Sequence, residues 1–139
     1  MQQNETKPSD YYCQQQSLAK RIQNSTFICK KFLDRVPLIF QPQPGSHVPW
    51  LQGSKILVPK TSTISALLCH VRSAMSLDSQ FGLYYMVDVS KKEISPFVNK
   101  QYSIIGGNEL VGALYLQFVK PDGFCYIYYA EESTFGAIE

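Results

Sequence analysis

The chain has 139 residues, which suits a single domain that buries its own core without a metal ion or a disulfide. Hydrophobic residues make up 45% of it and charged residues 17%, a balance typical of globular rather than disordered proteins. The net charge of +2 is too small to predict nucleic acid, or a strongly anionic surface, as the main partner.

The N-terminal region predicts a polar arm followed by a helix. Residues 1–16 are polar and rich in glutamine, so we expect a frayed arm with one helical turn near residues 10–16. From residue 17 to residue 32, apolar side chains recur at roughly helical spacing, which indicates a helix. Asn24, Ser25 and Thr26 weaken this prediction, because such side chains compete for backbone hydrogen bonds.

Two short strands are expected next. Residues 35–41 (RVPLIFQ) indicate a strand, but Pro37 has no amide hydrogen, so the ladder must skip it or leave it at an edge. Prolines and glycines over residues 42–54 indicate a loop. Residues 55–59 (KILVP) predict a second strand, which the proline at its end terminates.

The clearest predicted helix covers residues 63–75. Its apolar side chains at positions 64, 67, 68, 71 and 75 form one continuous stripe, and Thr61 or Thr63 can serve as its N-cap. The aromatic and branched residues at 81–87 (FGLYYMV) then indicate a strand.

The C-terminal third predicts a long loop, a short helix and a last strand. Residues 88–108 form a loop of unusual length for a compact domain, which suggests a functional or disordered insertion. A short helix is expected at 110–116, a tight turn at 121–123, a strand at 124–129 and a tail at 130–139. Two strands, a helix and two further strands is the order of a β-grasp domain, so the pattern predicts an α+β protein with an added N-terminal helix.

The cysteines and histidines do not predict a metal site or a catalytic pair. None has the spacing of a metal-ligand motif, and no sequence pattern supports a cysteine–histidine hydrolase. We therefore expect reduced thiols, no metal, no cofactor and no enzymatic activity. The residues concerned are Cys13, Cys29, Cys69, Cys125, His47 and His70.

The sequence gives no sign of a segment that enters a membrane unaided. The first 20 residues lack the apolar core of a signal peptide, and no stretch approaches the ~20 apolar residues that span a bilayer. Attachment to a membrane would therefore need an added anchor.

Five short segments, in order, resemble the GABARAP and microtubule-associated protein light chain 3 family of ubiquitin-like modifiers. Each match is weak alone, but together they cover residues 18–136. The segments are FLDRVPLI (32–39, family FPDRIPVI), KILVP (55–59, family K-Y/F-L-V-P), Val71-Arg72 (family Ile-Arg), DGFCYIYY (122–129, family DGFLYVxY) and ESTFG (132–136, family ENTFG or ESVYG).

The resemblance implies a ubiquitin-like β-grasp domain at residues 17–136, with one or more added N-terminal helices. It further implies that a cysteine protease removes residues 137–139 and that activating and conjugating enzymes join Gly136 to phosphatidylethanolamine on autophagic membranes. Phe135 would anchor the tail or be read by the protease. The protein would then be cytoplasmic, and bound to autophagosomal or vesicle membranes when lipidated.

The resemblance also implies that receptor and adaptor peptides dock along the strand at 55–59, with microtubules as a further candidate partner. An edge strand accepts an extended peptide whose alternate side chains enter pockets. One pocket would be lined by Lys55, Leu57, Ile28, Pro37 and Phe124, and the other by Ile56, Val58, Pro59 and Leu67. The alternative is that these apolar residues are ordinary core.

Charged residues would assist this docking. By resemblance, Lys55 and Arg72 pair with acidic residues that flank such motifs, which aids encounter and orientation. Arg35 either pairs with an acidic neighbour in the domain or contacts the peptide, and the sequence favours neither.

The chain departs from the family pattern in four places. Ala74 replaces a basic residue of the central helix, and Asn24 replaces an acidic residue near the first pocket. Gly53-Ser54 replaces part of a basic run, and residues 89–108 are longer than the family loop. These departures predict a divergent member whose choice of partners has changed.

Two other functions remain open from the sequence. The chain could be an interaction module that binds peptides or cytoskeleton and is never processed. It could also be a modifier conjugated to proteins, like the twelfth-type autophagy protein, although that relative usually ends in glycine without an extension.

Overall fold

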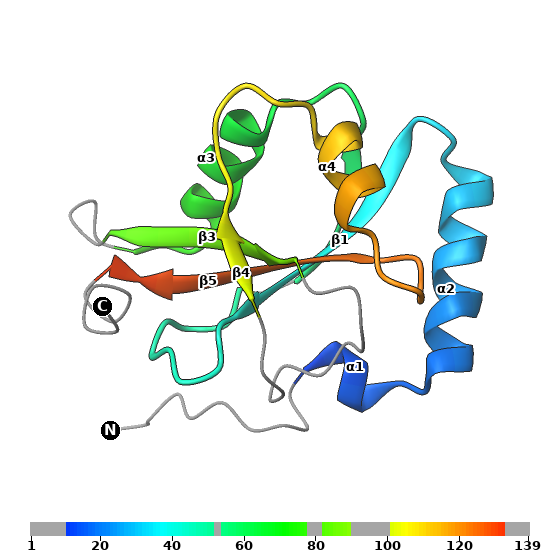
Figure 1. The fold of residues 1–139 in the computed structure, drawn as a ribbon, viewed down its shortest axis with the longest axis horizontal. Coiled ribbons are helices and arrows are strands. Elements are labelled where there is room, and N and C mark those ends of the chain that lie inside the picture. The colour runs from blue at the N-terminus through cyan, green and yellow to red at the C-terminus, as the bar shows by residue number, and fades with distance from the viewer. Residues whose placement is uncertain (1–10, 52–53, 78–81, 90–100, 133–139) are drawn as a thin grey trace.

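The computed structural model describes residues 11–51, 54–77, 82–89 and 101–132 (Figure 1). A mixed five-stranded sheet, in the order β2-β1-β5-β3-β4, lies between two layers of helices. The helices are α1 (Tyr12–Gln15), α2 (Leu18–Lys31), α3 (Ile64–Ala74) and α4 (Val111–Phe118); the strands are β1 (Arg35–Pro42), β2 (Lys55–Pro59), β3 (Leu83–Asp88), β4 (Tyr102–Ile104) and β5 (Cys125–Glu131). The predicted α+β class is confirmed.

Alternation along the strands divides the buried side chains between the two faces of the sheet. On one face, Cys125 and Ile127 of β5 pack in a cluster with residues of α3 and α4, which we call the α3-side core. On the other face, Phe124 and Tyr126 pack with α1 and with Ile28 of α2, which we call the α1-side core. The sheet is therefore buried on both faces.

Each long predicted helix forms, and its capping residue is visible in the sequence. The hydroxyl of Ser17 accepts a hydrogen bond from the amide of Lys20 at the start of α2, and Thr63 caps α3 in the same way. The polar residue Ser25, which argues against a helix, lies buried in α2 and donates to the carbonyl of Asp122 at 2.6 Å. Its hydroxyl thereby joins α2 to the turn before β5.

The ladder accommodates Pro37 without losing a hydrogen bond to β2. The amide of Phe40 donates to the carbonyl of Ser54, so alternate residues of β1 direct their backbone groups toward β2. Pro37 lies between two of these residues, so its backbone groups point the other way, toward β5. Pairing with β5 begins only at Leu38, which lies opposite Cys125. The ladder thus skips Pro37, as one of the two predicted solutions requires.

Two predicted segments differ from the structure. The helical turn expected near residues 10–16 forms as α1, but the arm around it is not frayed up to residue 16: Tyr11, Tyr12 and Cys13 are buried, because two adjacent aromatic rings pack in the α1-side core. A loop is expected over 88–108, but residues 102–104 form β4 against β3, and the residues after them are tied to the start of α3. Residues 90–100 lie outside the described part of the chain.

The predicted turn before β5 is built around Asp122. Its carboxylate, which is fully buried, accepts hydrogen bonds from the Arg21 guanidinium at 2.8 Å, the Tyr126 hydroxyl at 2.6 Å and the Phe124 amide at 3.0 Å. Gly123 has a φ of 89°, and a Cβ there would collide with the Ser25 side chain, so glycine is required. One carboxylate therefore links α2, the turn and β5.

Several buried hydroxyl and thiol groups predict alkaline destabilisation. Burial raises the pKa of Tyr129 and that of Cys125 to about 12, and it raises the pKa of Tyr126 and Tyr128 well above the ordinary value. The unfolded chain loses these protons from about pH 10 for tyrosine, so above that pH it binds fewer protons than the folded chain. We expect the free energy of unfolding from urea titrations to hold steady from pH 7 to about 8, to decline slightly near pH 9 as the Cys125 thiol of the unfolded chain loses its proton, and to fall steeply above about pH 10. A flat profile to pH 12 would contradict the burial of these groups.

Candidate functional site

The strand β2 lies at the edge of the sheet with one side open. Because Ser54 is hydrogen-bonded to Phe40, the ladder directs the groups of Ile56 and Val58 toward β1. The amide and carbonyl groups of Lys55 and Leu57 therefore point to the free edge. Within the described residues no strand pairs with that edge, so it offers a backbone template for an extended peptide.

The α1-side of β2 combines an apolar floor with a hollow. Leu57 lies opposite Pro37 in the ladder, and Ile28 of α2 packs against the α1-side core. A hollow of about 380 Å³, which we call the α2 hollow, lies between α2 and β2. It is lined by Lys20, Gln23, Asn24, Phe27, Ile28 and Lys55.

Of the residues predicted for the first pocket, the structure brings Ile28 and Lys55 together in the α2 hollow. Phe124 belongs to the same core as Ile28, but it is fully buried and stacks edge-to-face on Tyr12 at 5.3 Å. Phe124 therefore supports the floor from below. Whether a peptide side chain reaches it stays a prediction.

Lys55 is held in position by an aromatic ring. Its ammonium lies 4.8 Å from the centre of the Tyr12 ring, a cation–π distance. The Tyr12 hydroxyl accepts a hydrogen bond from the side-chain amide of Asn24 at 3.1 Å. Asn24, which stands where the resemblance expects an acid, thus orients the ring on which Lys55 rests.

The α3-side of β2 brings the other predicted group together only in part. Val58 and Leu67 are buried in the α3-side core, and the half-buried Ile56 packs against it. Pro59, in contrast, alternates onto the face of Lys55 and Leu57. Its grouping with the second pocket stays a prediction.

The two predicted arginines occupy different places. Arg35 is exposed at the start of β1, and no ion pair is found for it among the residues that the structure describes. Arg72 lies half-buried on α3 near β3. Burial raises the pKa of the Tyr85 hydroxyl on β3, and the charge of Arg72 opposes part of that rise. Arg72 is therefore set toward β3.

Sequence reasoning missed Tyr12 and Phe27. Tyr12 falls in the segment predicted as an arm, and the signal for it was a pair of aromatic residues in an otherwise polar stretch. Phe27 is 64% exposed at the rim of the α2 hollow, where its ring lies 5.8 Å from the Lys31 ammonium. An aromatic side chain on the polar face of the helix was the available signal.

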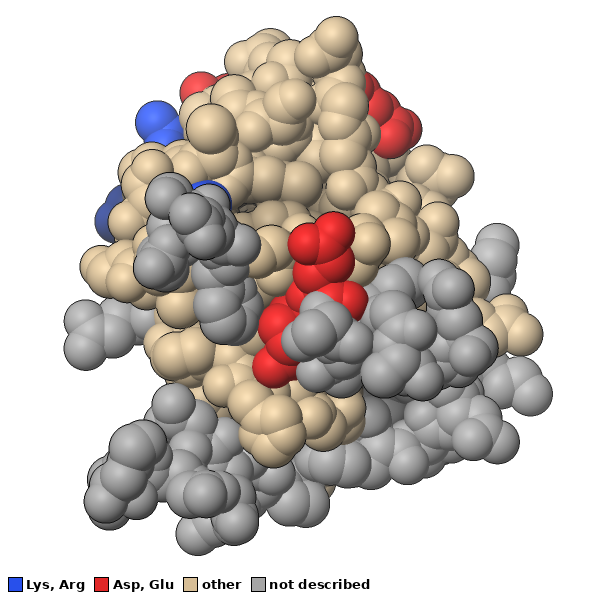
Figure 2. All heavy atoms as spheres, turned by 90° about the vertical axis from the view of Figure 1, so that its left-hand side faces the viewer, with Lys and Arg blue, Asp and Glu red and all other residues tan. Residues whose placement is uncertain are grey.

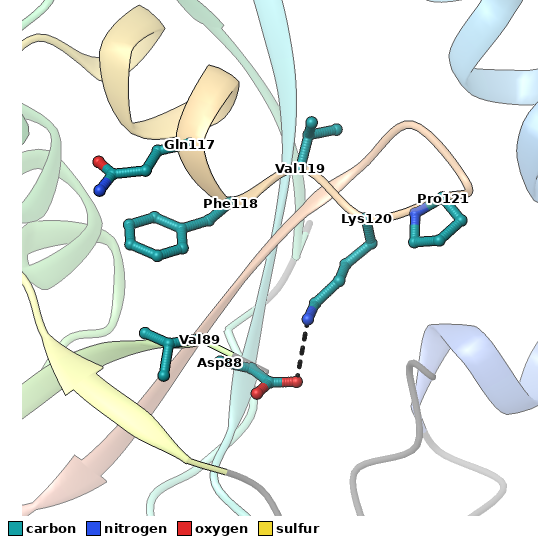
Figure 3. Close-up of a pocket in the computed structure, with 7 residues that line it drawn as sticks. All are labelled: Asp88, Val89, Gln117, Phe118, Val119, Lys120 and Pro121. Atoms are coloured by element: carbon teal, nitrogen blue, oxygen red, sulfur yellow. Dashed lines mark ion pairs between the residues drawn. The ribbon is translucent and has the colours of Figure 1, made fainter. Parts of the chain in front are cut away.

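A further hollow, of about 520 Å³, lies between the end of α4 and the end of β3 (Figure 3). The side chain of Lys120 points to Asp88, and the two buried groups form an ion pair at 3.1 Å. Phe118 and Val89 form apolar walls beside the pair. A buried pair of this kind fixes the segment after α4 against the sheet.

The C-terminal end of β5 is anchored before the predicted cleavage site. The Glu131 carboxylate accepts hydrogen bonds from the Ser46 hydroxyl and the His47 amide, and the Glu132 amide donates to the carbonyl of Gly82. Figure 2 shows this end of the molecule, with acidic side chains near the middle of the view. Phe135 and Gly136 lie outside the described residues.

Neither a metal site nor a membrane span is found in the described part of the chain. No group of three or more His, Cys, Asp or Glu side chains could hold a metal ion there. None of the helices described is long and apolar enough to cross a bilayer.

Comparisons with known proteins agree with the resemblance. A family model described as "Autophagy protein Atg8 ubiquitin like" matches residues 20–136. Autophagy-related protein 8 of Dictyostelium discoideum is 32% identical over 120 residues, which are 86% of this chain and 88% of that protein. Microtubule-associated protein 1 light chain 3 gamma of Homo sapiens is 30% identical over 127 residues, which are 91% of this chain and 78% of that protein.

One solved structure confirms the fold. The crystal structure of Trypanosoma brucei ATG8 superposes with a TM-score of 0.70 at 20% sequence identity, and the match covers 87% of this chain and 93% of that one. The ubiquitin-like fold predicted for this chain is therefore correct.

Proposed function

The chain belongs to the Atg8 family of ubiquitin-like autophagy proteins, and from that premise we propose that it is cleaved after Gly136 and joined to phosphatidylethanolamine. On autophagic membranes it then docks receptor and adaptor peptides along β2. In this role the chain is a substrate of a cysteine protease and of activating and conjugating enzymes, and is not itself an enzyme.

The observation that carries this proposal is where the family match ends. It runs from residue 20 to residue 136 and so includes Phe135-Gly136. Glycine has no Cβ, so it fits the narrow channel in which a processing or conjugating enzyme must reach the carboxylate. The anchored end of β5 supports this reading, because it fixes Glu131 and Glu132, which precede the predicted cleavage site by only a few residues.

Lipidation would supply the anchor that the described helices lack. Each buried CH₂ of an acyl chain contributes about 0.8 kcal/mol, and a phospholipid carries two chains. Attachment would therefore last until the bond is hydrolysed. The protein would move between the cytoplasm and the membranes of autophagosomes or vesicles.

Intact mass spectrometry of soluble and membrane fractions from the native cells tests the proposal. We expect the soluble form to lack Ala137, Ile138 and Glu139, and the membrane form to carry the added mass of a phospholipid. A chain that ends at Glu139 in both fractions would overturn it and would leave an unprocessed interaction module.

Docking at β2 predicts a dependence on alternate backbone groups of the peptide. We expect N-methylation of a peptide residue whose amide faces β2 to weaken binding by about fivefold or more, because it removes a backbone hydrogen bond worth about 1 kcal/mol. Calorimetry would compare two versions of one peptide, with an aromatic and an aliphatic residue at strand spacing, methylated at adjacent residues. Methylation at the residue whose amide faces solvent is the matched control. Equal loss in both versions would contradict strand addition.

A further inference from the structure

The sheet has a second open edge, formed by β4, on the side opposite β2. The amide of Val89 donates to the carbonyl of Gln101 at 2.8 Å across the ladder that joins β3 to β4. Backbone groups alternate along a strand, so those of Ser103 also point toward β3, and those of Tyr102 and Ile104 point away from the sheet. Among the described residues no strand pairs with this outer edge.

The edge of β4 has little protection against pairing. Edge strands usually carry charges, prolines or bulges, or are very short, and these features prevent another chain from adding to the sheet. The strand β2 has Lys55 at one end and Pro59 at the other. The strand β4 is short, but its residues Tyr102, Ser103 and Ile104 include neither a charge nor a proline. Ile104 is also 50% exposed, so a partner strand would remove apolar surface from water.

The sequence of β4 is complementary to itself when two copies are read antiparallel. Pairing around Ser103 places Tyr102 of each copy opposite Ile104 of the other. These are the residues whose amide and carbonyl groups point outward, so each opposed pair exchanges both of its backbone hydrogen bonds. The backbone of one copy therefore satisfies the open edge of the other.

The side chains agree with the same register. Tyr102 and Ile104 project from one face of β4, where the Tyr102 ring meets Tyr128 edge-to-face at 5.5 Å. An aromatic ring opposite a β-branched side chain is a favourable cross-strand pair, and two opposed serines form a hydrogen bond. No charge meets a like charge, because β4 carries none. A second copy thus supplies a suitable partner at each position, which an unrelated strand does only by chance.

We propose that the chain forms a two-fold symmetric dimer in which β4 of one copy pairs antiparallel with β4 of the other. The two five-stranded sheets then join into one continuous sheet. Because the two-fold axis closes the contact, assembly stops at the dimer. The proposal is independent of docking at β2, since that strand lies at the opposite edge of each sheet.

The dimer has a consequence for docking that does rest on the proposed function. It carries two β2 edges, one at each end of the joined sheet. Neighbouring strands lie about 4.7–4.9 Å apart, so the two edges are separated by roughly 40–45 Å. A receptor with two docking segments would bind both copies at once only if its linker spans that distance.

Sedimentation equilibrium and NMR diffusion of the full chain test the dimer. A single short strand pair makes a small, weak interface, so we expect monomer at about 10 μM and a substantial dimer fraction at about 1 mM. The backbone amide signals of Tyr102 and Ile104 should shift with concentration, and those of Lys55 and Leu57 should not. A chain that is monomeric at about 1 mM would overturn the proposal. Growth beyond the dimer would also overturn it, because it requires an open head-to-tail contact such as β4 on β2.

Variants on the edge separate pairing from folding. Proline is tolerated in an edge strand where its missing N–H would face solvent, so Ile104→Pro removes an outward donor and no bond to β3. It should stay monomeric at about 1 mM, whereas the matched control Ile104→Val keeps the amide and should dimerise. Ser103→Lys places like charges opposite each other across the axis and should also be monomeric. Trp50 fluorescence checks the fold. Dimers of Ile104→Pro and Ser103→Lys as strong as the wild type would place the contact elsewhere and overturn the proposal.

A cysteine at position 103 tests the register directly. Opposed residues that exchange no backbone hydrogen bonds have Cα atoms about 4.5 Å apart, which is within the range of a disulfide. A Cys69→Ser background removes an exposed native thiol. In that background, with oxidised glutathione, Ser103→Cys should form covalent dimers at least about tenfold faster than Gln117→Cys, which is exposed on α4. Equal rates for the two variants would show that β4 does not pair with itself.

Discussion

Replacing Gly136 with alanine is expected to leave the chain uncleaved and to abolish its recovery with membranes. Under the proposed function the added Cβ would obstruct the enzyme channel that must enclose the residue at the scissile bond, and no other anchor is found in the described helices. Cell fractionation followed by intact mass spectrometry measures both effects. The variant should keep Ala137, Ile138 and Glu139 and stay in the soluble fraction.

Two controls assign the loss to Gly136. Replacing Ala137 with glycine changes the neighbouring residue and should leave membrane recovery intact. A chain shortened to end at Gly136 should reach membranes without the protease, because only the cleavage step has been bypassed. If Gly136→Ala associates with membranes as the wild type does, the chain is an unprocessed module.

Elements with a strong local apolar pattern could be predicted from the sequence. The apolar residues of α3 recur with the period of a helix, whereas β2 and β5 are short continuous apolar runs bounded by a proline or a tight turn, so the local pattern is sufficient. The Asp122-Gly123 turn was visible for the same reason, because its residue types determine the backbone conformation there.

Features that depend on distant partners could not be predicted. The helical turn expected near residues 10–16 forms as α1, but its burial was missed, because it depends on Tyr11 reaching Pro42 and Tyr12 reaching Gln41, contacts that span about thirty positions of sequence. The short strand β4 has two exposed residues and exists because β3 lies beside it. Local composition contains neither kind of information.

Part of the candidate site could likewise be predicted from the sequence, and part of it could not. Membership of Lys55 and Leu57 in an open edge strand follows from the sequence pattern and the resemblance. The support of Lys55 by Tyr12, and of Tyr12 by Asn24, requires α1 to fold back on the sheet. The family pattern alone would count Asn24 only as a lost charge.

Replacing Asp122 with alanine is expected to cost about 3–5 kcal/mol of unfolding free energy, the range for breaking a buried ion pair on one side. Burial acts to lower the pKa of Arg21, but the hydrogen bond and charge of Asp122 outweigh it and raise the value, so Arg21 stays charged. Without Asp122 that charge is buried unpaired, and the Tyr126 hydroxyl also loses its acceptor. Urea titration followed by Trp50 fluorescence measures the loss.

A double-mutant cycle distinguishes the unpaired charge from a general loss of packing. Arg21→Met removes the guanidinium but keeps an apolar side chain of similar reach, so combining it with Asp122→Ala should restore part of the lost stability. Exposed ion pairs contribute only about 0–1 kcal/mol. A loss within that range for Asp122→Ala would therefore mean that Arg21 can turn into solvent. In that case only the Ser25 hydroxyl and apolar packing would join α2 to the turn before β5. The helix that lines the α2 hollow would then be held less firmly than the buried ion pair indicates.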